Sequence, residues 1–216
     1  MDLSSVQNFT IWVLPILFAI TVHEVAHGWV AMRLGDPTAK MLGRLTLNPI
    51  KHIDPIGTVV VPGFLLLTGG FLFGWAKPVP VTWENLKNPR RDVAFVALAG
   101  PGANLLMAIF WALVMKIGLV LGPTTDSWFY PLALMGRAGI EINLILMLLN
   151  LLPIPPLDGG RVLSSLLPGP LSYKFDRLEP YGIFIILGLL FLGVLSMVLS
   201  PMLATMRVMM YALVGL

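Results

Sequence analysis

Thr21-Val22-His23-Glu24-Val25-Ala26-His27 places two imidazoles and a carboxylate inside an apolar segment that runs from about residue 9 to residue 33. Two of the three histidines of the chain lie here. Residues four apart on an α-helix share one face, so His23 and His27 can direct their ring nitrogens at one metal ion. Ionisable side chains inside a membrane segment are costly and usually functional. The stretch therefore predicts a membrane-spanning helix that carries a metal site.

Glu24 follows the first histidine and lies about 100° further round the helix, so it would flank a bound ion and reach a water molecule beside it. The pattern His-Glu-x-x-His on a helix is typical of zinc metalloproteases, in which the histidines hold the metal and the glutamate is the general base. The alternative is a chance group of polar residues on a solvated helix face. That alternative fits an apolar segment poorly.

The composition is that of an integral membrane protein. Of the 216 residues, 57% are apolar and 12% are charged, and the mean hydropathy is +0.87. A spanning helix needs about 20 apolar residues, so we expect a single membrane domain over residues 1–216. The absence of cysteine excludes disulfides and thiolate zinc ligands. The net charge of +3 reflects which loops face the cytoplasm, and not binding to nucleic acid. We therefore expect a multi-pass protein of the cell membrane, with the lipid bilayer as its partner.

Apolar segments predict an all-α polytopic membrane fold with about five transmembrane helices, at residues 9–33, 92–115, 131–152, 181–199 and 201–216. Ser200-Pro201 separates the last two segments. Arg137 and Glu141 lie four residues apart in the third segment, which favours an intrahelical ion pair. The loop at 117–130 has no basic residue and is expected outside the cytoplasm, whereas the polar segment 153–180 returns to the cytoplasmic side.

The apolar stretch at 57–75 is interrupted by glycines and a proline, and basic residues lie on both sides of it. If it crossed the membrane, one basic loop would face the wrong side, so we expect a re-entrant element buried against protein. Residues 77–82 alternate like a strand, but Pro78 and Pro80 confine such a strand to a sheet edge. Together with part of 41–48 they would form a small β-sheet at the membrane face.

A catalytic zinc site takes three protein ligands and keeps a fourth position for water, so a third ligand must come from elsewhere. Few other acidic residues lie in or beside apolar segments: Glu141, which has Arg137 as a partner, and Asp158. Asp158 follows three prolines that break the helix and precedes two glycines that let the backbone turn closely round the carboxylate. The alternative for Asp158 is an ordinary turn at a helix end.

Three motifs, in this order, resemble the site-2 protease family of intramembrane zinc metalloproteases. They are His23-Glu24-Val25-Ala26-His27 in a first span, Gly100-Pro101-Gly102-Ala103-Asn104 in a middle span, and Asn150-x-x-Pro153 leading to Leu157-Asp158-Gly159. The matched part runs from residue 20 to residue 165, and residues 43–55 resemble the small prokaryotic branch, without a PDZ or CBS domain.

The resemblance implies that His23, His27 and Asp158 bind Zn²⁺. It also implies that Glu24 is the catalytic base and that Asn150 lies near the substrate carbonyl. The implied activity is hydrolysis of a peptide bond within or near a transmembrane segment of a membrane protein substrate.

Two further polar residues have two interpretations each. Asn104 could stabilise the substrate carbonyl in place of Asn150, or hold helices together. His52, the third histidine, could be a transient ligand or a polar gate at the mouth of the site, or an ordinary loop histidine.

The position of the motif also sets how a substrate would reach it. His27 lies six residues before Arg33, so a rise of 1.5 Å per residue puts the metal about 10 Å inside the cytoplasmic face. A substrate helix must unwind before cleavage, because its carbonyl groups are hydrogen-bonded. We expect residues 77–82 to pair with the unwound segment by strand addition.

Two other functions compete with proteolysis: a membrane metal transporter and a catalytically inactive membrane scaffold. A transporter would need a relay, and no second acidic or histidine relay site lies along another apolar segment. A scaffold would not need the four expected catalytic positions, all of which are intact. Metal flux into liposomes that survives Glu24→Gln would favour transport.

Overall fold

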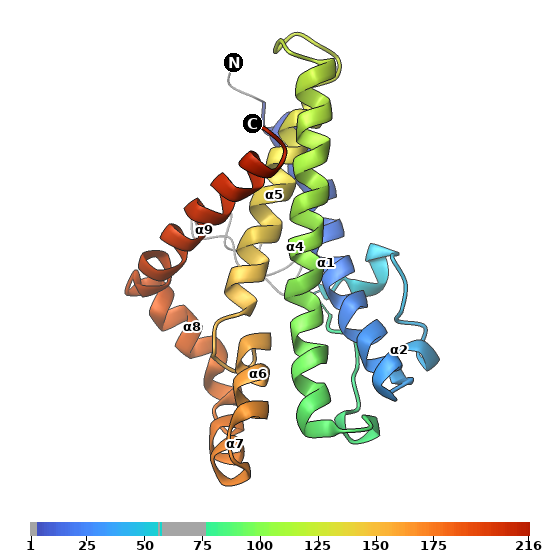
Figure 1. Ribbon diagram of the computed structural model, residues 1–216, viewed down its shortest axis with the longest axis vertical. Helices are drawn as coiled ribbons and strands as arrows, with labels where there is room; N and C mark the ends of the chain where they lie inside the picture. The colour runs from blue at the N-terminus through green and yellow to red at the C-terminus, as the bar shows by residue number, and fades with distance from the viewer. Residues whose placement is uncertain (1–3, 56, 58–76) are drawn as a thin grey trace.

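The computed structural model describes residues 4–55, 57 and 77–216, and the regular elements among them are all helical (Figure 1). The long helices are α1 (Ser5–Leu34), α4 (Pro89–Leu121), α5 (Tyr130–Asn150) and α9 (Val194–Leu213). The short ones are α2 (Thr38–Met41), η1 (Pro49–His52), η3 (Trp83–Asn85), α6 (Asp158–Leu166), α7 (Gly169–Asp176), η4 (Glu179–Tyr181) and α8 (Gly182–Phe191). Apart from Gly57, the expected re-entrant element at 57–75 lies outside the described residues.

The predicted small β-sheet is wrong, because no strand forms in the part of the chain that the structure describes. Residues 77–82 run without regular structure, and side chains and loops use their backbone groups. The N–H of Lys77 donates to the carbonyl of His52 at 2.9 Å, and the Arg44 guanidinium donates to the carbonyl of Lys77 at 3.0 Å. Pro78 and Pro80 have no N–H to give to a ladder.

Among the described residues, four helices and not five are long and apolar enough to cross a membrane: Val6–Leu34, Pro89–Leu121, Tyr130–Asn150 and Val194–Leu213. The predicted spans at 181–199 and 201–216 are wrong. The chain turns at Gly193, whose φ of +72° suits a residue without a Cβ, and Pro201 lies inside α9. α8 has 10 residues, which span about 15 Å, half of a bilayer core.

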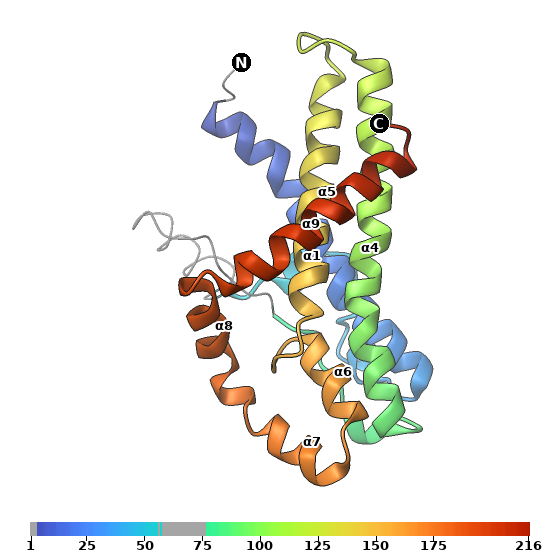
Figure 2. The same ribbon diagram turned by 60° about the vertical axis from the view of Figure 1, so that its left-hand side comes forward.

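α4 and α5 form the centre of the bundle because glycines let their backbones approach closely. A Cβ on Gly136 would lie 2.5 Å from the backbone nitrogen of Met115, and one on Gly118 would lie 2.4 Å from that of Ala133. α1 packs against both helices and α9 crosses α5 (Figure 2). The buried core gathers side chains from α4, α5 and the C-terminal region: Ala108, Trp111, Ala112, Met115, Ala133, Ile140, Leu144, Met147, Leu148, Met210 and Val214.

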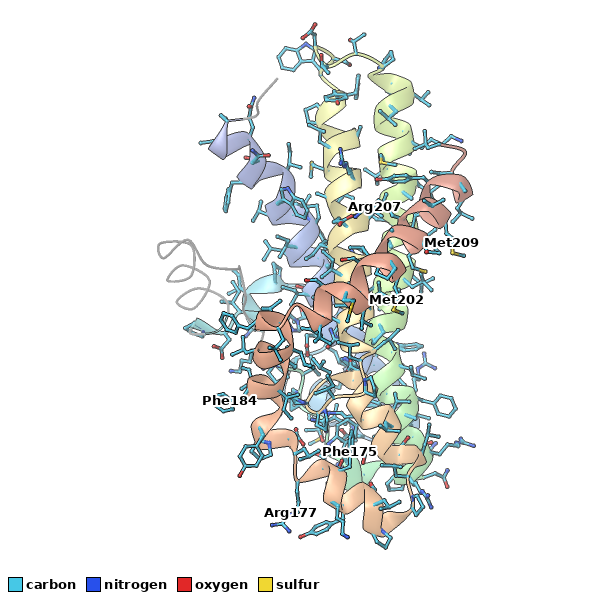
Figure 3. The ribbon with its side chains drawn as sticks, turned by 90° about the vertical axis from the view of Figure 1, so that its left-hand side faces the viewer. Phe175, Arg177, Phe184, Met202, Arg207 and Met209 are labelled. Atoms are coloured by element: carbon cyan, nitrogen blue, oxygen red, sulfur yellow. The ribbon has the colours of Figure 1, made fainter. Side chains whose placement is uncertain are left out.

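Glu141 does not pair with Arg137 as predicted. The Arg207 guanidinium of α9 reaches across to α5 and donates to both oxygens of Glu141, at 2.7 and 3.0 Å (Figure 3). An arginine placed before a glutamate at four residues' spacing is the weaker intrahelical order, whereas a two-pronged guanidinium contact is a strong one. The ion pair therefore joins two candidate spans instead of two turns of one helix.

Candidate metal centre

Three of the predicted site residues come together. His23 and His27 lie one turn apart on α1, and Asp158 is the first residue of α6. The two Nε2 atoms are 3.0 Å apart, and Oδ2 of Asp158 lies 3.3 Å from Nε2 of His23 and 3.4 Å from Nε2 of His27. The imidazole planes are nearly perpendicular, at 84°. Asp158 lies 131 or more positions after the two histidines in the sequence, yet its carboxylate and both imidazoles present three ligand atoms to one point.

The chain after α5 brings Asp158 to α1. α5 ends at Asn150, and the prolines that follow prevent the helix from continuing. Two glycines then allow α6 to begin close to that turn. A Cβ on Gly159 would lie 2.2 Å from the carbonyl oxygen of Leu151, and one on Gly160 would lie 2.6 Å from the nitrogen of Pro155. Only glycine fits at these two positions without a backbone shift.

The ligands come from α1 and α6, and Gly100 on α4 lines the remaining side of the site. A Cβ at this position would lie 2.4 Å from Nε2 of His27 and 2.5 Å from Cε1 of His23. The bare glycine backbone therefore leaves the volume that the two imidazoles occupy.

The hydrogen bonds of the imidazoles determine which ring nitrogens carry protons. Nδ1 of His27 lies 2.7 Å from the carbonyl oxygen of Val96, which can only accept, so Nδ1 is the protonated nitrogen. Nδ1 of His23 lies 2.6 Å from Oδ1 of Asn104. The amide nitrogen of Asn104 donates to Oδ1 of Asn143 at 2.9 Å and to the carbonyl of Ala19 at 3.2 Å, so its oxygen is the atom that faces His23. In the neutral rings both Nε2 atoms are consequently bare.

These atoms fit a zinc ion. Oδ2 of Asp158 is buried and has no hydrogen-bond partner within 4–55, 57 and 77–216. Three electron-rich atoms therefore face one another without a proton between them, an arrangement that a cation stabilises. Tetrahedral ligands bound to zinc at about 2.0–2.2 Å are separated by about 3.3–3.6 Å, close to the three distances observed here. Two imidazoles and one carboxylate are also a donor set that zinc accepts.

Glu24 lies beside the cluster and is held from outside α1. The backbone N–H of Val79 donates to Oε2 of Glu24 at 2.7 Å. Gly28, one turn further along α1, makes this approach feasible, because a Cβ there would lie 2.7 Å from Cγ1 of Val79 and 2.7 Å from Cδ2 of Leu45. One carboxylate oxygen is thus anchored to the segment at 77–82.

The remaining predicted residues have different surroundings. Asn104 is fully buried and contacts His23, so it lies directly behind a predicted ligand. Asn150, at the end of α5, donates to the carbonyl of Leu146 at 3.0 Å. His52 is buried in η1, and its Nε2 lies 2.9 Å from the carbonyl oxygen of Thr46. His52 is not one of the three clustered ligands.

Sequence reasoning did not single out Gly28, Val79 or Asn143, which contacts Asn104. Gly28 had a signal, since a glycine inside a helix is about 1 kcal/mol less favourable than alanine and often marks a close approach. Val79 and Asn143 carry no such signal in the sequence. Val79 acts through its backbone N–H, which every residue except proline has, and the sequence does not show which group a single asparagine in an apolar segment will contact.

Comparisons with known proteins find similarity to one family of peptidases. Residues 11–132 and 124–193 match the family model of peptidase family M50. Two similar curated proteins bear the name "Putative zinc metalloprotease". YwhC of Bacillus subtilis is 41% identical over 199 residues, which cover 88% of this chain and 84% of that protein. Rip2 of Mycolicibacterium smegmatis is 32% identical over 193 residues, 87% of this chain and 69% of that protein.

A more distant relative is the regulator of sigma E protease of Haemophilus influenzae. It is 28% identical over 140 residues, which cover 61% of this chain and 31% of that protein. No solved structure gives a significant match.

Proposed function

The chain belongs to peptidase family M50, the site-2 protease family of intramembrane zinc metalloproteases, and from this premise we propose that the cluster on α1 and α6 is its catalytic zinc site. The protein is a zinc metalloprotease. It is also a membrane protein, because the part of the chain that the structure describes has four apolar helices long enough to span a bilayer. The observation that carries the proposal is the set of three ligand atoms, 3.0 to 3.4 Å apart, beside Glu24.

His23, His27 and Asp158 would hold the zinc ion, which in such sites acidifies a water molecule and polarises a carbonyl group. Glu24 would then accept a proton from the attacking water as the water oxygen bonds to the peptide carbon. As the peptide C–N bond breaks, Glu24 would return that proton to the leaving amine. Because Oε2 of Glu24 is engaged by Val79, Oε1 is the atom assigned to proton transfer.

The two asparagines have distinct parts in this proposal. Asn104 uses its oxygen and both amide hydrogens inside the bundle, so it has no donor left for a substrate. Asn150 uses one amide hydrogen on Leu146, and its second amide hydrogen has no acceptor among the residues that the structure describes. We therefore assign Asn150 to the carbonyl oxygen as its negative charge develops; losing such a donor typically raises a barrier by about 2.7–4 kcal/mol.

The substrates follow from the location of the site. We propose transmembrane proteins of the cell membrane, cleaved by a single membrane-embedded domain over residues 1–216. A substrate helix must still unwind to expose its carbonyl. The expected strand addition at 77–82 loses support, because the N–H groups of Lys77, Val79 and Thr82 donate to His52, Glu24 and Asp36 respectively.

The test compares the wild type with Glu24→Gln and His23→Ala, purified and reconstituted in liposomes with a reporter transmembrane substrate. Glu24→Gln should keep its zinc and cleave at least about a hundredfold more slowly, as expected for loss of a general base. His23→Ala should lose both zinc and cleavage. Cleavage by Glu24→Gln at the wild-type rate would refute the base assignment, and zinc flux into the liposomes that persists in this variant would favour a transporter.

A further inference from the structure

A chain of polar side chains crosses the interior of the bundle and ends on a predicted metal ligand. It begins with Asn143 on α5, continues through Asn104 on α4 and reaches His23 on α1. Nδ2 of Asn104 donates to Oδ1 of Asn143 at 2.9 Å, and Oδ1 of Asn104 lies 2.6 Å from Nδ1 of His23. Both asparagines are completely inaccessible to solvent.

The orientation of each amide in this chain is determined. Nδ2 of Asn143 donates to the carbonyl of Gly139 at 2.8 Å, and because a carbonyl can only accept, the oxygen of Asn143 must face Asn104. That oxygen accepts one amide hydrogen of Asn104, and the carbonyl of Ala19 accepts the other at 3.2 Å. The oxygen of Asn104 is then the only group left to face His23.

The orientation of Asn104 matters because it selects the tautomer of His23. With the oxygen facing Nδ1, the ring carries its proton there and Nε2 is bare toward His27 and Asp158. If the amide were rotated by 180°, an N–H would face Nδ1 and the proton of a neutral ring would sit on Nε2, where the metal binds. His27 has no such ambiguity, because its Nδ1 faces the backbone carbonyl of Val96.

We propose that Asn143 is a positioning residue of the metal centre, which fixes the Asn104 amide and through it the zinc-binding tautomer of His23. The proposal deepens the proposed function and rests on its zinc site. Helix association is a weaker explanation for the two amides. α4 and α5 already meet through glycine contacts and a large apolar core, and buried amides in a membrane protein add only modestly to helix packing.

The test is the zinc affinity of the full chain in detergent, measured by competition with a chelator. Outer hydrogen-bond partners of metal ligands typically contribute 10–100-fold to affinity, so Asn143→Ala should weaken zinc binding by about tenfold or more. The matched control is Leu144→Ala, the neighbouring buried position on α5, which belongs to the apolar core and not to the polar chain. Leu144→Ala should bind zinc within about threefold of the wild type.

Asn143→Asp supplies a rescue, because it keeps an oxygen facing Asn104, and should restore most of the affinity. Wild-type affinity in Asn143→Ala, or an equal loss in Leu144→Ala, would overturn the proposal. If Asn143→Ala does not fold, nitrogen-15 NMR of the zinc-loaded wild type decides: the Nδ1 proton of His23 should exchange slowly with solvent, and fast exchange would overturn the assignment. Zinc retention by His23→Ala would instead refute the zinc site itself.

Discussion

The backbone N–H of Val79 donates a 2.7 Å hydrogen bond to Oε2 of Glu24, so a segment 55 residues further along the chain holds the proposed catalytic base. The bond leaves one carboxylate oxygen for proton transfer and limits rotation of the side chain. The segment at 77–82, which has no regular secondary structure, therefore orients the proposed catalytic base.

Replacing Val79 with proline removes this donor. Val79→Pro should lower the rate of cleavage by about tenfold, because a misoriented base loses part of the 10²–10⁴-fold that general-base catalysis supplies. Zinc content should not change. Val79→Ala is the control, because it loses the side chain that packs against Gly28 but keeps the N–H. Equal rates for the two variants would show that the hydrogen bond has no catalytic role.

Gly100→Ala tests the wall that α4 provides. The new Cβ would lie 2.4 Å from Nε2 of His27, so the imidazole must move and zinc affinity should fall by about tenfold or more. Gly102→Ala, two residues along the same helix, meets no atom within 4 Å and is the matched control. Chelator competition on both variants checks the expectation, and unchanged affinity in Gly100→Ala would contradict it.

The ion pair between Glu141 and Arg207 should hold α9 against α5. Glu141→Gln and Arg207→Gln should each lower the free energy of unfolding, and a double-mutant cycle should give a coupling of about 0.5–3 kcal/mol. Thermal unfolding in detergent measures it. Glu141→Arg combined with Arg207→Glu should recover part of the loss. Additive single effects would mean that the contact does not stabilise the bundle.

Asp36 predicts a pH dependence of stability outside the candidate spans. Burial alone would raise the pKa of its carboxyl, but hydrogen bonds from Thr38, Asn85 and the Thr82 backbone hold this pKa below its ordinary value of 3.8. A pKa that is lowered in the folded state stabilises the protein at pH values above this ordinary pKa, and the stabilisation is lost as the pH falls through the folded-state pKa.

Thermal unfolding from pH 6 to pH 3 should therefore show a steeper loss of stability in the wild type than in Asp36→Asn, with the difference appearing below about pH 4. Parallel curves for the two proteins would show that Asp36 does not contribute.

The parts of the site that sequence could predict are those set by local geometry. His23 and His27 are four residues apart, so one helical turn places them on the same face. The prolines and glycines around Asp158 predict a tight turn, whatever part of the protein that turn contacts. The long helices at 92–115 and 131–152 follow from apolar length in the same way, although α4 begins three residues earlier and ends six residues later.

The parts that sequence could not predict depend on distant partners. Glu141 has an arginine one turn away, yet its partner comes from α9, whose position depends on how the chain turns at Gly193. A proline favours a helix end more strongly than a glycine does, so the sequence predicts the boundary between the last two helices at Pro201. The helix α9 continues through Pro201, because a helix tolerates one missing N–H. The predicted sheet is wrong because side chains and the carbonyl of His52 bind the backbone groups of residues 77–82.

The most direct measurement of the central claim is the zinc content of Asp158→Ala, determined by mass spectrometry of the purified full chain beside the wild type and Glu24→Gln. Asp158 is the ligand that only the fold brings to the two histidines. The wild type and Glu24→Gln should each carry one zinc ion per chain, and Asp158→Ala should carry almost none after brief dialysis against a weak chelator. Full retention of zinc by Asp158→Ala would contradict the three-ligand site.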